Sequence, residues 1–187
     1  MALDTIGCGI EGLLVIKPRI FGDQRGYFYE SYSSKVYAEA GITDHFIQDN
    51  QSYSKKGVLR GLHFQSPPFA QTKLVRVASG IVYDVALDLR RDSPTFGKYY
   101  GVELSEFNHL QFYIPAGFAH GYLVLSETAI FQYKCNQYYH PSAEGGIRFD
   151  DPEVDIRWPL SPSTFEVSPK DLKLPTLKEY INRHVFV

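Results

Sequence analysis

The sequence predicts an all-β fold, an antiparallel double sheet closed into a barrel or sandwich. Three observations predict it. Short strand-like runs recur at close spacing, turn signals separate them, and 14 tyrosines and 13 phenylalanines favour strands. No low-complexity stretch, internal repeat or Pro/Gly-rich linker divides the chain, so we expect a single domain over residues 1–187.

The expected strands follow one another along most of the chain. In order they are Leu13–Lys17, Gly26–Ser31, Phe46–Ser54, Lys73–Ser79, Gly80–Asp88, Gly97–Leu104, Leu110–Ile114, Gly121–Val124 and Thr128–Asn136. Turn signals lie at Phe21–Gln24, Ser93–Thr95 and Ser105–Asn108. Only Lys35–Ala40 and Leu172–Tyr180 read as helix, and the second contains Pro175, so the C-terminal helical segments are expected to be short.

Two local patterns refine this expectation. The runs Lys73–Ser79 and Ile81–Asp88 meet at Ser79-Gly80, which predicts a tight hairpin. In the second run, one set of alternate residues is mixed and the other is apolar. The mixed set is Val82, Asp84, Ala86 and Asp88, and the apolar set is Tyr83, Val85, Leu87 and Leu89. A barrel of this kind can hold a small ligand in its mouth.

Charge and cysteine usage exclude several classes of protein. A net charge of -2 provides no basic footprint for nucleic acid or an anionic membrane. No segment reaches the apolar length of a membrane span, and the N-terminus lacks a signal pattern. Cys8 and Cys135 have no metal-ligand spacing and are expected to be reduced thiols. The sequence therefore predicts a soluble, cytoplasmic protein without nucleic-acid or membrane partners.

His63 is the most informative candidate residue, in the apolar, glycine-flanked segment 57–65. An imidazole titrates near neutrality, so it can remove a proton from a carbon that a neighbouring carbonyl acidifies. The nearby cations Arg60 and Lys73 could then stabilise the oxyanion. For a lone histidine, the stronger interpretation is a core residue hydrogen-bonded for structural reasons, and the rest of the sequence has to overturn it.

The histidines do not complete a metal site of the kind found in cupin barrels. His120 stands after a turn, as the second half of such a motif requires. The first half would be His-x-His followed by glutamate, but here His63-Phe64-Gln65 is followed by Ser66-Pro67-Pro68-Phe69-Ala70. Two histidines without a carboxylate fall short of the three protein ligands of a catalytic metal, so we expect no metal.

Nine segments together resemble the dTDP-4-dehydrorhamnose 3,5-epimerase family, from about Leu13 to Asp171, in the family's order and spacing. They are Arg25–Glu30, Gln48–Ser52, Gly57–Gln65, Lys73–Val77, Asp88–Gly97, Ile114–Gly121, Tyr133–Cys135, Glu144–Ile147 and Ser168–Asp171. The resemblance implies a cupin-like double-sheet barrel (jelly roll) that works as a homodimer without metal or cofactor. Its substrate would be dTDP-4-dehydro-6-deoxy-D-glucose, epimerised at C3 and C5 to dTDP-4-dehydro-L-rhamnose.

The family's chemistry agrees with the interpretation of His63, because both carbons flank the C4 ketone and lose a proton to form an enolate. By resemblance His63 is the base, Asp171 orients it, and Tyr133 is the acid on the other face. Lys73 and Arg60 would face the enolate oxygen. Each residue has a plainer interpretation: Tyr133 a packed strand residue, Asp171 a helix N-cap and Lys73 a solvated strand-end charge.

The remaining matched residues are expected to bind substrate, with His120 close to the enolate oxygen. Arg25, Phe28 and Glu30 would meet the thymidine of a substrate held by the neighbouring subunit, although Arg25 and Glu30 could also form a surface ion pair. The other roles are Gln48 and Asn50 on sugar or nucleotide polar groups, Lys170 and Arg60 on the pyrophosphate, Tyr139 stacked on the base, and Glu144 on the ligand.

One departure and three alternatives remain. Phe149 replaces the family's tryptophan, which affects local packing rather than chemistry. The alternatives are a mono-epimerase acting at C3 or C5 of a related dTDP-4-ketosugar, a barrel that binds a nucleotide-sugar without turnover, and a metal-dependent cupin oxygenase. The intact Tyr133, Lys73 and Asp171 favour the double epimerase, and the ligand count disfavours the oxygenase.

Overall fold

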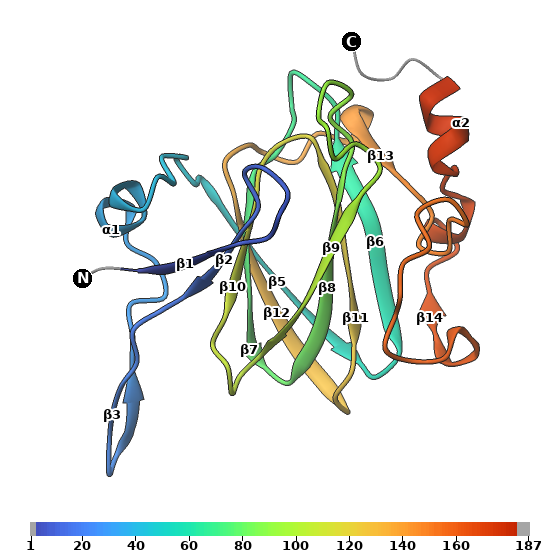
Figure 1. The fold of residues 1–187 in the computed structure, drawn as a ribbon. Helices are drawn as coiled ribbons and strands as arrows, with labels where there is room; N and C mark the ends of the chain where they lie inside the picture. Colours follow the sequence, from blue (N-terminus) through green and yellow to red (C-terminus); the bar gives the residue numbers. More distant parts are fainter. Residues whose placement is uncertain (1–2, 183–187) are drawn as a thin grey trace.

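A computed structural model describes residues 3–182, whose strands form two facing sheets that close into a jelly-roll barrel (Figure 1). The first sheet runs in spatial order through β1 (Asp4–Gly7), β2 (Leu14–Lys17), β10 (Gln111–Ile114), β7 (Lys73–Ser79), β12 (Thr128–Cys135) and β5 (Gln48–Lys55). The second runs through β13 (Glu144–Gly146), β6 (Val58–Gln65), β11 (Phe118–Val124), β8 (Ile81–Asp88) and β9 (Tyr99–Ser105), with β14 (Glu166–Val167) parallel to β6. The predicted all-β, cupin-like double-sheet barrel is confirmed.

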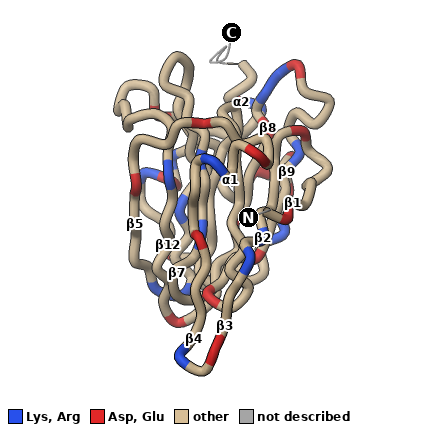
Figure 2. Tube along the Cα trace, turned by 90° about the vertical axis from the view of Figure 1, so that its left-hand side faces the viewer, with Lys and Arg blue, Asp and Glu red and all other residues tan. Residues whose placement is uncertain are grey.

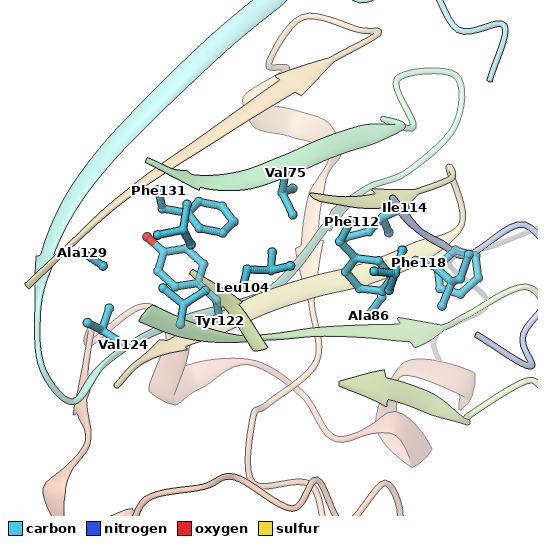
Figure 3. Close-up of a cluster of buried hydrophobic side chains, with 14 of the residues drawn as sticks. Val75, Ala86, Leu104, Phe112, Ile114, Phe118, Tyr122, Val124, Ala129 and Phe131 are labelled. Carbon is cyan, nitrogen blue, oxygen red and sulfur yellow. The ribbon is translucent and has the colours of Figure 1, made fainter. Parts of the chain in front are cut away.

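The core between the sheets is built from alternate strand residues. Val75 and Phe131 of the first sheet meet Ala86, Leu104 and Tyr122 of the second (Figure 3). The rings of Tyr122 and Phe131 stack with centroids 4.1 Å apart. Burial of each large apolar side chain stabilises the fold by about 1.5–3 kcal/mol, so this layer is what holds the sheets together.

Strand β8 is buried on both faces. Val82 and Ala86 point into the core between the sheets, whereas Val85 and Leu87 pack outside, in a cluster with Leu177 of the C-terminal segment. The mixed face of the predicted alternation is therefore the one that faces the barrel interior. The apolar face is covered by the C-terminal segment rather than by the opposite sheet.

The predicted hairpin at Ser79-Gly80 is wrong, because β7 and β8 belong to different sheets. Gly80 has φ +86, and a Cβ there would lie 2.2 Å from the Thr128 carbonyl oxygen. The glycine thus allows a close crossing between sheets, a feature that a two-residue turn signal cannot distinguish from a hairpin.

Strand β6, which carries His63, is absent from the expected strands, as are β1, β13 and β14. Its alternation breaks at Gly61, where φ is +127 and a Cβ would lie 2.5 Å from the Gly121 Cα of β11. The β6–β11 register shifts at this point, between His120 and Tyr122. A bulge at Gly61, where two strands approach closely, therefore interrupts the pattern from which the strand would have been predicted.

The predicted turn at Phe21–Gln24 is instead the first half of a hairpin formed by β3 (Phe21–Asp23) and β4 (Gly26–Phe28). This hairpin projects from the barrel (Figure 1), and its tip carries opposite charges (Figure 2). The ion pair there joins Arg25 to Asp23, with Nη2 and Oδ2 2.6 Å apart.

Helices are few and short. Helix α1 (Ser34–Glu39) agrees with the prediction, but the expected helix Leu172–Tyr180 is wrong in its first half. Asp171–Lys173 is a 3-10 turn, and α2 (Leu177–Asn182) begins only after Pro175, which lacks the N–H that a continuous helix needs. Two further 3-10 turns lie at Pro141–Ala143 and Pro162–Thr164. None of the helices within residues 3–182 is long and apolar enough to cross a membrane.

Candidate active site

A cavity of about 380 Å³ is lined by residues of both sheets and of the C-terminal segment. It brings together half of the residues that the sequence analysis selected. They are Arg60, His63, Lys73, His120, Tyr133, Lys170 and Asp171. The cavity is therefore the place where the predicted chemistry has to be tested against geometry.

The His63 imidazole contacts a buried carboxylate from a distant part of the chain. Its Nε2 lies 2.7 Å from Oδ1 of Asp171, and the backbone N–H of Gly61 donates to Oδ2 at 3.3 Å. The Ser168 hydroxyl holds the backbone at Asp171 in place, because it accepts a hydrogen bond from the Asp171 N–H at 3.1 Å. The Asp171 side chain does not cap its own 3-10 turn, so the N-cap interpretation is wrong.

This pairing sets the charge and the orientation of both groups. Burial by itself would raise the pKa of Asp171, but the hydrogen bond and the positive charge of His63 outweigh it, so the pKa is lowered overall. Asp171 is thus an anion at neutral pH. Nε2 of His63 faces Asp171, and Nδ1 has no hydrogen-bond partner among residues 3–182. Nδ1 is therefore the nitrogen left for a substrate.

Tyr133 reaches the same cavity from the opposite sheet. On β12 it pairs with Val75 of β7 and Asn50 of β5, and its ring packs against the core beside Phe131. Burial raises the pKa of Tyr133 to about 12, with Cys135 and Tyr122 adding to the effect and Arg60 opposing it. The phenol therefore keeps its proton at neutral pH and can donate it.

Cationic and imidazole groups complete the cavity wall. His120 is the direct cross-strand partner of His63 on β11, and its Nε2 lies 3.0 Å from each carboxylate oxygen of Asp84. Lys73 lies on β7 and, among residues 3–182, has no carboxylate within ion-pair distance. Arg60 donates from Nε to the Ser54 hydroxyl at 3.1 Å. An anion in this cavity would thus meet Lys73 as a cation without a fixed partner.

Three of the predicted binding residues form a cluster next to the cavity. Lys170 Nζ lies 2.6 Å from Oε2 of Glu144, and the Tyr139 hydroxyl donates to the same oxygen at 2.7 Å. Burial would raise the pKa of Glu144, but the hydrogen bonds from Lys170 and Tyr139 lower it overall. Tyr139 is 53% exposed, which leaves its ring open to a planar ligand.

Gln48 and Asn50 lie on the same face of β5, as predicted, and Gln48 Nε2 donates to Asn50 Oδ1 at 2.9 Å. Neither lines the cavity with His63. Asn50 lines a neighbouring pocket of about 370 Å³ that shares Tyr133 with it.

Arg25, Phe28 and Glu30 are not brought to the cavity of their own chain. Phe28 is 64% exposed on the projecting hairpin, and Glu30 lies beyond the end of β4. The expected strand Gly26–Ser31 is too long at its C-terminal end, because β4 ends at Phe28 and Glu30 is not in a strand. The surface ion pair of Arg25 is made with Asp23, not with Glu30.

Gln65 occupies the position of the second histidine of a cupin motif. Its side chain links two loops by hydrogen bonds. Its Nε2 donates to the carbonyl oxygens of Phe69 at 2.7 Å and Tyr138 at 3.2 Å, and its Oε1 accepts from the His140 N–H at 2.6 Å. Within residues 3–182, no three His, Cys, Asp or Glu side chains gather in a way that would hold a metal ion. That the protein uses no metal stays a prediction.

The sequence analysis missed the cavity residues Ser52 and Tyr122, whose hydroxyls lie 2.7 Å apart, and the buried Asp84. The alternation of β8 did place Asp84 on the mixed face, which was the one available signal. Phe149 lies outside the cavity, and its carbonyl accepts from the Trp158 indole at 2.9 Å.

Comparison with known proteins places this geometry in context. Residues 8–179 match the family model described as dTDP-4-dehydrorhamnose 3,5-epimerase. The enzyme of that name from Escherichia coli is 50% identical over 180 residues, 96% of this chain and 97% of its own. A dTDP-6-deoxy-D-glucose-3,5-epimerase from Legionella pneumophila, solved in complex with dTDP-4-keto-L-rhamnose, is 52% identical with a TM-score of 0.90, covering 94% of this chain and 93% of that one. A 3'-monoepimerase from Streptomyces bikiniensis, solved with dTDP-quinovose, is 30% identical with a TM-score of 0.87, covering 95% and 90%.

Proposed function

The chain belongs to the dTDP-4-dehydrorhamnose 3,5-epimerase family, and on that premise we propose that it converts dTDP-4-dehydro-6-deoxy-D-glucose to dTDP-4-dehydro-L-rhamnose by inverting C3 and C5. One observation supports the chemistry most directly. The His63–Asp171 pair and Tyr133 come from opposite sheets and line one cavity. A base and an acid on opposite walls are what inversion of a carbon centre requires.

His63 starts each inversion by taking the proton from the carbon next to the C4 ketone. The electron pair of the broken C–H bond forms a double bond between that carbon and C4, and the π electrons of the ketone move onto its oxygen to give an enolate. Asp171 holds the ring in one tautomer and stabilises the imidazolium that forms. Lys73, Arg60 and His120 supply the positive charge and hydrogen bonds that face the oxygen.

Tyr133 completes the inversion by donating its proton to the opposite face of the same carbon. The neutral phenol is the right species for this step, because burial raises its pKa to about 12. His63 then releases its extra proton to solvent and Tyr133 takes up a proton from solvent, so each inversion is balanced. The same pair acts at C3 and at C5, since both flank the ketone.

The nucleotide would extend from the cavity over the cluster next to it. Lys170 and Arg60 would bind the diphosphate, and Lys170 would exchange its contact with Glu144 for one with phosphate. The exposed ring of Tyr139 would stack on the base. Gln48 and Asn50 would bind polar groups of the sugar or nucleoside.

We further propose a homodimer in which Arg25, Phe28 and Glu30 of one subunit bind the thymidine at the other subunit's site. The support is that the hairpin projects from its own barrel and exposes Phe28 (Figure 1). We also propose a cytoplasmic location, because Cys8 and Cys135 are free thiols.

Mixing two inactive variants tests the shared site. An Arg25→Ala/Phe28→Ala double variant and His63→Ala are each expected to be nearly inactive. Unfolding and refolding them together should restore about a quarter of the wild-type activity, because about half of the dimers are mixed and each mixed dimer has one intact site. The activity would stay at the level of the parents if the hairpin served its own subunit. Wild-type protein carried through the same treatment is the control for recovery.

The double reaction itself is tested by NMR of the product formed from dTDP-4-dehydro-6-deoxy-D-glucose. We expect inverted configuration at both C3 and C5. Inversion at one centre only would make the protein a mono-epimerase, the activity named for the 30% identical relative. Binding of the sugar without inversion at either centre would identify a binding protein.

A further inference from the structure

Asp84 is a buried carboxylate that no step of the proposed mechanism uses. It has 0% exposure and does not line the cavity, so it cannot touch the substrate. Among residues 3–182, His120 is the only hydrogen-bond partner of its side chain, with both oxygens 3.0 Å from Nε2. A buried carboxylate with one neutral or cationic partner is costly, so Asp84 is a candidate for a role other than stability.

The strand register connects Asp84 to the cavity through His120. Asp84 lies on the interior face of β8 with Val82 and Ala86, and His120 of β11 pairs with Ala86 on one side and with His63 on the other. His120 is 7% exposed and lines the cavity. The carboxylate fixes Nε2 of this ring, which determines how the imidazole faces the cavity.

Asp84 is also the carboxylate best placed to balance the charge of Lys73, which lies on the opposite sheet. Burial raises the pKa of Asp84, and the charges of His120 and Lys73 oppose that effect. The groups that face Lys73 are Asp84 of β8, Cys135 of β12 and Glu144 of β13. Burial raises the pKa of Cys135 to about 11, so the thiol is neutral, and Glu144 is already paired with Lys170. Asp84 is the remaining carboxylate.

His120 faces Asp84, Lys73 and His63, and Asp84 faces His120 and Lys73. Burial lowers the pKa of Lys73 and of His120, and in both cases the charge of Asp84 opposes that effect. Removing the carboxylate would therefore make both groups lose their protons at lower pH.

We propose that Asp84 is a positioning residue for the epimerase reaction, which fixes the His120 ring and provides the counter-charge for the protonated forms of His120 and Lys73. The proposal rests on the proposed function, because that function assigns His120 and Lys73 to the enolate oxygen. Asp84 acts through His120 and Lys73 and makes no contact with the reacting carbons.

The test compares Asp84→Asn with Asp88→Asn. Both aspartates lie on β8 with 0% exposure, but Asp88 is held by Arg90, Ser93 and Thr95 rather than by a cavity residue. For Asp84→Asn, measured with dTDP-4-dehydro-6-deoxy-D-glucose, we expect kcat to fall about 10- to 100-fold with little change in KM. The alkaline limb of its pH profile should move to lower pH, because Lys73 loses its counter-charge. Asp88→Asn should unfold at a lower temperature and keep the wild-type alkaline limb.

A second readout does not depend on turnover. Nitrogen-15 NMR of histidine-labelled protein should show His120 losing its proton at lower pH in Asp84→Asn, whereas Asp84→Glu should restore wild-type behaviour. The proposal is overturned if the His120 signals and the alkaline limb match wild type, or if Asp84→Asn and Asp88→Asn behave alike. If wild-type protein fails to turn over the sugar, the proposed function fails, and the NMR comparison still decides whether Asp84 controls His120.

Discussion

Replacing His63 by alanine is expected to lower kcat by about 10³-fold or more while the protein stays folded. The imidazole lines the cavity, and its Nε2 lies 2.7 Å from the buried carboxylate of Asp171, which would stabilise the imidazolium formed when the base takes a proton. Its side chain is 32% exposed and is not part of the apolar core, so truncation should leave the melting temperature close to that of wild type. Turnover of dTDP-4-dehydro-6-deoxy-D-glucose and circular dichroism measure the two effects.

Two further variants separate the base from its support. Asp171→Asn keeps the shape of the pair but removes the charge that stabilises the imidazolium, so it should retain more activity than His63→Ala. The exposed His45 is the control position, and His45→Ala should behave as wild type. A His63→Ala protein that keeps near wild-type turnover would show that another group removes the proton.

Replacing Tyr133 by phenylalanine is expected to lower kcat by about 10²-fold and to change KM little, because it removes the proton donor and keeps the ring. The enolate would still form, since the His63–Asp171 pair is untouched. Exchange of the substrate's proton with solvent should therefore fall less than product formation, and one of the two inversions should survive better than the other.

Tyr122→Phe is the matched control for this variant. Tyr122 also lines the cavity, but its hydroxyl pairs with Ser52 and its ring stacks on Phe131. It should reduce kcat much less than Tyr133→Phe does. If Tyr133→Phe instead raised KM and left kcat unchanged, Tyr133 would be a binding residue and the acid would have to be sought elsewhere on that wall.

The sequence predicted which residues lie together better than it predicted the paths of the strands. His63, Lys73, Tyr133 and Asp171 were selected together because a family pattern fixes their joint spacing, and the structure brings all of them to one cavity. Periodicity alone favoured a plainer interpretation for each. Strand β6 was missed because the bulge at Gly61 interrupts the alternation on which strand prediction depends.

What the sequence could not provide is the tertiary context of single residues. The Ser79-Gly80 signal does not reveal whether the next strand joins the same sheet or the opposite one, because that choice depends on packing across the barrel. Asp84 was noticed only as part of a mixed face, since its pairing with His120 depends on the register of β8 with β11. Whether Arg25 and Phe28 serve a second subunit depends on a partner chain, which the register of one chain cannot place.

Incubation of the protein with dTDP-4-dehydro-6-deoxy-D-glucose in deuterated water, followed by NMR of the sugar, tests the central claim most directly. If a proton is removed and returned at both carbons, deuterium should appear at C3 and at C5. With His63→Ala, neither carbon should take up deuterium. Protein without activity toward the sugar would leave both carbons unlabelled. Inversion without deuterium uptake, or equal labelling by His63→Ala, would contradict a mechanism in which His63 exchanges the proton through an enolate.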